Sequence, residues 1–101
     1  MKIVPFCEVD ESLFNPEFNV EHFHSGTSLE ADVVIINIDS IFEFEENKST
    51  ICKDKFVSIA IIDDESDYEA FKNFGIDAWI RHADISQINN IINLVNKRFL
   101  S

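Results

Sequence analysis

Side chains that could do chemistry follow the apolar runs of this sequence, at the positions where the runs end. Most of them are acids or amides. Carboxylates can bind a divalent cation or act as nucleophiles. The set consists of Glu8, Asp10, Asn37, Asp39, Asp63, Asp64, Arg81 and His82. These residues come from segments far apart in the sequence, so their chemistry depends on whether the fold brings them together.

Five stretches predict strands, at residues 2–7, 19–24, 32–37, 56–62 and 77–81. The third and fourth are apolar without alternation, which is typical of a strand covered on both faces. The second alternates apolar and polar residues, so His22 and His24 would share one face. Pro5 cannot donate a hydrogen bond to a neighbouring strand, which indicates an edge position or a bulge in the first strand.

Two helices are expected between the later strands. Ser40 and Glu43 have the spacing of a capping box, which predicts a short helix from about Ile41 with a loop after it. Ser66 and Glu69 repeat the pattern and predict a second helix over residues 66–74.

A third helix is expected over residues 84–99, capped by Asp84 with Gln87 three residues on. Gly75 stands where a glycine ends the preceding helix. The last helix would bury one apolar face. That face consists of Ile85, Ile88, Ile91, Ile92, Val95 and Phe99. The phenylalanines at positions 71, 74 and 99 are expected in the core.

Strands that alternate with helices predict a three-layer α/β fold with a mostly parallel sheet and right-handed connections. In such sheets function gathers where the strands end, at their carboxyl edge. We therefore expect the acids named above to meet at one edge. The chain of 101 residues is long enough for one domain, residues 1–101.

Charge and cysteine content exclude several classes of protein. Eight Lys and Arg stand against nineteen Asp and Glu, a net charge of −11, which opposes direct contact with nucleic acid or an anionic membrane. Cys7 and Cys52 are too few for a disulfide scaffold. The start lacks the apolar core of a signal peptide, and no apolar run approaches the ~18 residues of a membrane span. A reducing cytoplasm fits best.

The pattern resembles the receiver domain of two-component response regulators. The likeness is best from about Ala31 to Phe99. ADVVIINID resembles the third strand, which leads into the phospho-accepting aspartate, and VSIAIIDDE resembles the fourth, which ends in a hydroxyl residue. AFKNFGIDAWIRHAD resembles the fifth, which ends in lysine and proline, and KIVPFCE the first, which ends in magnesium-binding acids. The resemblance implies a receiver-like, flavodoxin-like sheet in the order 2-1-3-4-5.

The departures from the family fall on its working residues. Asn37 stands at the phospho-acceptor position, and an amide has no ionised oxygen to form an acyl phosphate. Asp63 stands at the hydroxyl position, His82 or Arg81 at the lysine position, and Cys7 with Glu8 at the acidic pair. The resemblance therefore implies an atypical receiver that is not phosphorylated and not an enzyme. Asn37 would be either a switch element or an amide that caps a neighbouring loop.

The stretch between Glu8 and Asn37 is too short for two helices and a strand, because a crossover alone needs about a dozen residues. The first or the second helix is therefore expected to be reduced to a loop. The candidate segments are residues 10–18 and 25–31.

The resemblance implies a protein partner or a second copy bound by the face built from residues 66–99. Trp79 and Tyr68 are assigned to this face, and Phe71 is a candidate for it as well as for the core. A DNA-binding output domain could belong to a longer protein. Two alternatives stay open: a receiver phosphorylated on Asp39 or Asp63, and an unrelated small α/β binding module, which another strand order would favour.

No cofactor is expected. The weak candidates for a magnesium site are Glu8, Asp10 and Asp39, joined at the same edge by Asp63 and Asp64. The competing interpretation is that these are solvated loop acids, and that Asp39 caps the following helix. His22 and His24 are candidate metal ligands, the alternative being an ordinary exposed strand face. His82 is a candidate pH sensor, the alternative being a loop histidine.

Overall fold

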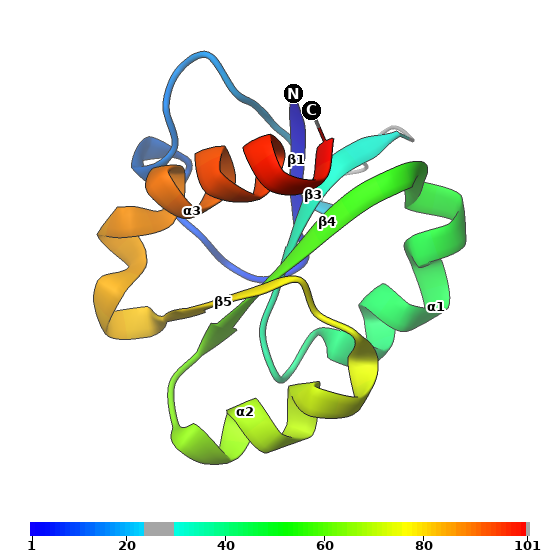
Figure 1. Ribbon diagram of the computed structural model, residues 1–101, viewed down its shortest axis with the longest axis vertical. Helices are drawn as coiled ribbons and strands as arrows, with labels where there is room; N and C mark the ends of the chain where they lie inside the picture. The colour runs from blue at the N-terminus through cyan, green and yellow to red at the C-terminus, as the bar shows by residue number, and fades with distance from the viewer. Residues whose placement is uncertain (24–29, 101) are drawn as a thin grey trace.

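The computed structural model describes residues 1–23 and 30–100. Within them the chain forms a parallel sheet of five strands in the order β2-β1-β3-β4-β5, as expected (Figure 1). The strands are β1 (Lys2–Pro5), β2 (Asn19–Val20), β3 (Ala31–Ile36), β4 (Cys52–Ile62) and β5 (Ala78–Arg81). The α-helices are α1 (Ile41–Ile51), α2 (Glu65–Phe71) and α3 (Ile88–Val95). None of the described helices is long and apolar enough to cross a membrane.

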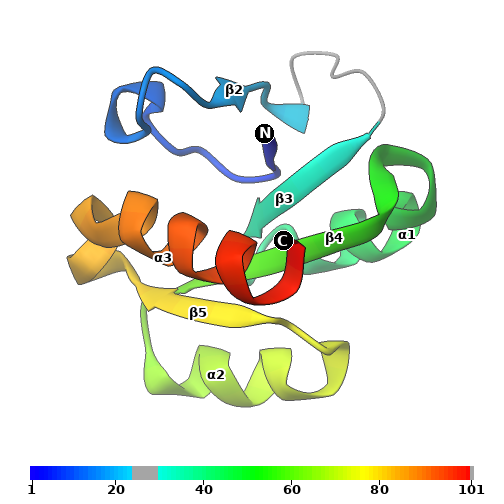
Figure 2. The ribbon, with the colours of Figure 1, turned by 45° about the horizontal axis from the view of Figure 1, so that its top comes forward.

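Helices cover the sheet on both faces, which makes three layers (Figures 1 and 2). Successive strand side chains point to opposite faces. Val33 and Ile35 of β3 therefore join the core beneath α3, while Val34 and Ile36 join the core beneath α1 and α2. This two-sided burial explains why the β3 and β4 sequences are apolar without alternation.

The connection from β1 to β2 contains no α-helix. One 3₁₀ turn, η1 (Glu11–Leu13), takes the place of the first helix, which is therefore shortened as one of the two alternatives predicted. Asn89 of α3 makes two hydrogen bonds to this connection. Its Oδ1 accepts from the Asn15 N–H at 2.9 Å, and its Nδ2 donates to the Leu13 carbonyl at 2.7 Å. Phe14 is buried behind it. The other candidate segment, 25–31, lies mostly outside the described residues.

Three strand predictions are wrong in extent, and the first of them is β1, which ends at Pro5 instead of residue 7. β2 contains only Asn19 and Val20 instead of residues 19–24, and His24 lies outside the described residues. β4 begins at Cys52, directly after α1, so the expected loop is absent. Cys52 pairs with Ala31, which extends the ladder four residues beyond the apolar run that marked this strand.

Pro5 occupies neither a bulge nor an edge strand, since β1 lies between β2 and β3. β2 pairs only with Lys2 and Ile3. Pro5 therefore pairs on one side alone, with Ile35 of β3. The N–H that proline lacks is not needed for a hydrogen bond between the strands.

The cap of α2 differs from the prediction. Asp64, not Ser66, is the N-cap, and its carboxylate accepts from the Ser66 N–H at 3.3 Å. Asp67 completes the capping box by accepting from the backbone N–H of Asp64 at 3.3 Å. Gly75 has φ 66°, the left-handed conformation expected of a glycine that ends a helical segment, here the 3₁₀ turn η3 (Lys72–Phe74).

The last helix begins later than predicted. Residues 82–87 form the 3₁₀ segment η4 (His82–Gln87), in which Asp84 has non-helical φ and ψ, and Gln87 is the N-cap of α3. Ile88, Ile92 and Val95 are buried as the spacing predicted. Phe99 is 40% exposed and lies in a π-helical end, η5 (Asn96–Leu100), so its assignment to the core is wrong.

Candidate functional site

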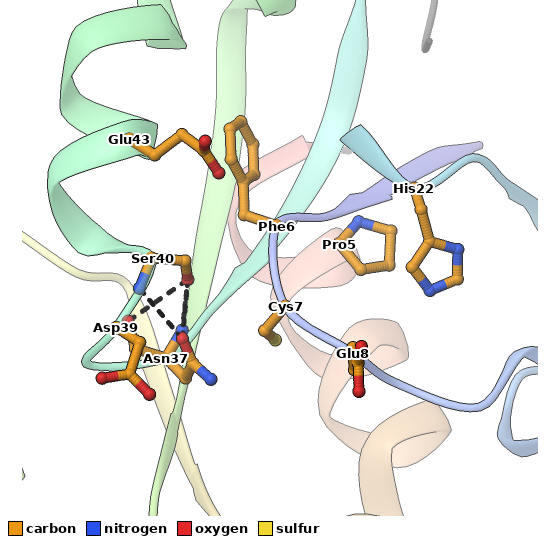
Figure 3. Close-up of a pocket in the computed structure, with 9 residues that line it drawn as sticks. All are labelled: Pro5, Phe6, Cys7, Glu8, His22, Asn37, Asp39, Ser40 and Glu43. Atoms are coloured by element: carbon orange, nitrogen blue, oxygen red, sulfur yellow. Dashed lines mark hydrogen bonds between the residues drawn. The ribbon is translucent and has the colours of Figure 1, made fainter. Parts of the chain in front are cut away.

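A cavity of about 590 Å³ opens at the carboxyl ends of β1 and β3, beside the first turn of α1 (Figure 3). This is the edge at which the fold class predicts a site. The lining residues are Pro5, Phe6, Cys7, Glu8, His22, Asn37, Asp39, Ser40 and Glu43. Five of the sequence-predicted positions are thus brought together: Glu8, Asn37, Asp39, the Cys7 of the acidic-pair position and the metal-ligand candidate His22.

Asn37 follows the last residue of β3 and organises the turn into α1. Its Oδ1 accepts from the Ser40 N–H at 3.0 Å and from the Ser40 Oγ at 2.8 Å, and its own N–H donates to that Oγ at 2.9 Å. Ser40 is only 6% exposed and makes no side-chain cap to α1, so the predicted capping box with Glu43 is wrong. The amide of Asn37 therefore has the loop-capping role weighed above.

Cys7 and Glu8 differ in environment although they are neighbours. Glu8 is exposed at the rim, while Cys7 is half-buried with its Sγ 3.9 Å from the Ile35 carbonyl. Burial raises the pKa of the Cys7 thiol to about 11 by desolvation, so the group is neutral at physiological pH. The acidic-pair position therefore carries a single carboxylate.

Cysteine alkylation should be slow in the native protein. Burial likewise raises the pKa of Cys52 to about 11, and only the thiolate is nucleophilic. The two-unit rise predicts iodoacetamide modification at pH 8 about 100-fold slower than in the urea-denatured chain. Equal alkylation rates in the native and denatured chains would contradict the raised pKa values. Mass spectrometry of the Cys52→Ser variant measures the alkylation of Cys7 alone.

The same rise in thiol pKa predicts a pH dependence of stability. The thiols ionise near pH 9 in the unfolded chain but only near pH 11 in the native protein, so the free energy of unfolding should fall between about pH 9 and about pH 11.

The acids at the sheet edge, the weak candidates for a magnesium site, have separate surroundings. Asp10 instead caps η1, accepting from the Ser12 N–H at 2.9 Å, and that bond lowers the pKa of its carboxyl group. Asp64 caps α2. No three His, Cys, Asp or Glu side chains among the described residues form a group that could hold a metal ion. Glu8 and Asp39 line the cavity without converging as ligands.

His22 is held by the β1–β2 connection. Its Nε2 lies 2.9 Å from the Val9 carbonyl and its Nδ1 lies 3.4 Å from Glu11 Oε1. Both ring nitrogens thus face acceptors from one segment, which leaves neither directed at a metal. The proposed partner ligand, His24, lies outside the described residues.

The ends of β4 and β5 form a separate exposed cluster. Asp63 Oδ1 lies 3.8 Å from His82 Nδ1, and Arg81 Nη2 lies 3.9 Å from Glu65 Oε1. Exposed pairs at such distances contribute little to stability. The groups at the hydroxyl and lysine positions are therefore solvated side chains, outside the residues that line the cavity.

The predicted partner face carries an aromatic pair. Tyr68 of α2 and Trp79 of β5 stack with ring centroids 5.0 Å apart. Tyr68 is 44% exposed, and the Trp79 Nε1 is buried with no hydrogen-bond partner. A groove of about 300 Å³ runs beside the pair, lined by Ile62, Glu65, Tyr68, Glu69 and Arg81. Phe71, in contrast, is fully buried beneath α2, so it belongs to the core and not to this face.

Four cavity residues were not singled out from the sequence as parts of a site: Pro5, Phe6, Ser40 and Glu43. Ser40 and Glu43 did give a signal, because they are three residues apart at the start of a predicted helix. Their role as cavity walls depends on where the first turn of α1 lies relative to β1, and no local pattern contains that information.

The fold and the strand-end cavity define an α/β protein with the sheet order of the flavodoxin-like fold. No family model, no curated protein and no solved structure matches the chain. Folds with this order serve several functions, so the function is argued from the residues of the site.

Proposed function

We propose that the chain is a receiver-like regulatory module that does not accept a phosphoryl group and acts through protein contacts. The observation that carries this proposal is Asn37. It lies just past the end of β3, at the mouth of the cavity, and its amide oxygen is occupied by two hydrogen bonds from Ser40.

The surroundings of Asn37 also argue against phosphoryl transfer. Of the two residues at the acidic-pair position, Glu8 is the only carboxylate, and Cys7 is a neutral thiol. The cavity lining contains no Lys or Arg to stabilise transferred phosphate. Asp39 and Asp63 are the remaining candidate acceptors. Neither lies within a group of ligands that could hold the magnesium such chemistry uses.

The Tyr68–Trp79 pair is the surface we assign to a protein partner or a second copy. Aromatic side chains dominate the binding energy of many interfaces. The Trp79 N–H is buried without an acceptor among the described residues, which costs about 1–3 kcal/mol. The net charge of −11 makes a nucleic acid an unsuitable direct partner. An output domain that binds DNA could still belong to a longer protein.

Both cysteines are free among the described residues, which is in keeping with a reducing compartment such as the cytoplasm.

The proposal is tested by incubating the protein with acetyl phosphate and magnesium and measuring its intact mass. No gain of a phosphoryl group is expected. A gain that Asp39→Asn or Asp63→Asn abolishes would establish the unorthodox receiver instead, with the substituted residue as the acceptor. The matched control is Asp84→Asn, which removes one exposed acid outside the cavity and should leave the mass spectrum unchanged.

A further inference from the structure

The cavity at the ends of β1 and β3 has the size and walls of a small-molecule site. Its volume of about 590 Å³ lies within the range of roughly 300–1,000 Å³ that ligand sites occupy. Pro5 and Phe6 give it an apolar wall. Phe6 is 2% exposed and is held by a stacked contact with Phe23, centroids 4.5 Å apart, and an edge contact with Phe44 at 5.7 Å. Packing therefore fixes the position of the Phe6 ring, and only a small part of its surface borders the cavity.

The charge of the lining selects the class of ligand. Glu8, Asp39 and Glu43 contribute three carboxylates, and no Lys or Arg lines the space. Figure 3 shows the Glu43 carboxylate reaching toward the Phe6 ring and the Asp39 carboxylate at the outer side of the turn. An anion would meet repulsion here, whereas a cation would be attracted to the carboxylates.

The same geometry favours an organic cation over a metal ion. The three carboxylates are not grouped as ligands for one metal. A longer molecule can place its charged end near one or two of them while its apolar body rests on Phe6.

A neutral donor is also available to such a molecule. The Asn37 amide is oriented by its oxygen, which accepts from Ser40. Its Nδ2 has no hydrogen-bond partner among the described residues and lies on the side of Cys7 (Figure 3). A ligand hydroxyl or carbonyl could accept from it.

We propose that this cavity binds a small organic cation, an ammonium compound with an apolar or aromatic body. The site is independent of the partner face around Trp79, so it extends the proposed function without resting on it.

The test is a set of amide NMR titrations with three probes of matched shape: benzylammonium, benzyl alcohol and benzoate. Benzylammonium should shift the amides of residues 6–8, 37–40 and 43 saturably. Its affinity should exceed that of the other two by roughly tenfold, which is the ratio that one favourable charge contact gives near a protein surface. Glu8→Gln combined with Glu43→Gln should remove most of this preference.

The matched control is Glu65→Gln combined with Glu69→Gln, which changes the net charge equally but lies on α2, outside the cavity. This variant should bind benzylammonium as the wild type does. Equal binding of benzyl alcohol, stronger binding of benzoate, absence of saturable shifts at these residues, or equal loss in both double variants would each overturn the proposal. The acetyl phosphate experiment can fail or succeed without changing any of these outcomes.

Discussion

Phe71→Ala should lower the free energy of unfolding by about 3–5 kcal/mol, which is the usual cost of emptying a phenylalanine site in a core. Phe71 is fully buried, in the cluster that α1 and α2 form with the sheet. Its neighbours in that cluster include Ile36 of β3 and Ala60 of β4, the central strands. The cavity left by the substitution would thus lie against the middle of the sheet, where little can move to fill it.

Urea denaturation measures this effect, with Phe42→Ala as the control. Phe42 is also a helical phenylalanine, but it is 69% exposed, and its ring makes an edge contact with Phe74. Its removal should cost about 1 kcal/mol or less. Similar losses of stability in the two variants would mean that the side chain of Phe71 is not in the core, and Phe71 would then be assigned to the surface.

Asn37→Ala should lower the free energy of unfolding by about 1–2 kcal/mol, because it removes two hydrogen bonds of a buried serine. The Ser40 N–H and Oγ both donate to the Asn37 Oδ1, and Ser40 is 6% exposed. The variant would remove these two bonds at the entry to α1, while the Asn37 backbone carbonyl would still accept from the Ser40 N–H at 3.1 Å and from the Ser40 Oγ at 3.3 Å. Asn37→Asp should be far milder, since a carboxylate oxygen can accept both bonds.

The comparison of the two Asn37 variants checks the role of the amide. Thermal or urea unfolding gives the stability, and amide hydrogen exchange in residues 38–44 should speed up in Asn37→Ala alone. A stable Asn37→Ala protein would show that the turn does not depend on the side chain, and the role of Asn37 would then have to lie in the cavity.

Much of the fold follows from local patterns. The apolar residues 33–36 are buried on alternate faces, and their lack of alternation predicted a central parallel strand. The spacing of Ile88, Ile92 and Val95 predicted the buried face of α3. Gly75 was identified as the end of a helical segment because few residues besides glycine adopt φ 66° without strain.

Helix boundaries were less predictable, because several capping patterns compete within a few residues. The segment from Asp63 to Asp67 contains an acid or serine at nearly every position, and each could serve as an N-cap. β4 continues to Ile62, so α2 begins at Glu65 and Asp64 becomes the cap. The long-range pairing of β4 with β3 and β5 thus decided a question that looked local.

For the candidate site, the sequence by itself determined which polar residues follow the strands, since burial of apolar runs places strand ends at one edge of a parallel sheet. Only the tertiary structure decided which of them share a space. Asp10 turns back to cap η1, Asp64 caps α2, and Glu43 of α1 comes to lie in the wall with Glu8. Periodicity records which side of an element is buried, whereas a site depends on turn conformations and on the packing of one element against another over a few ångströms.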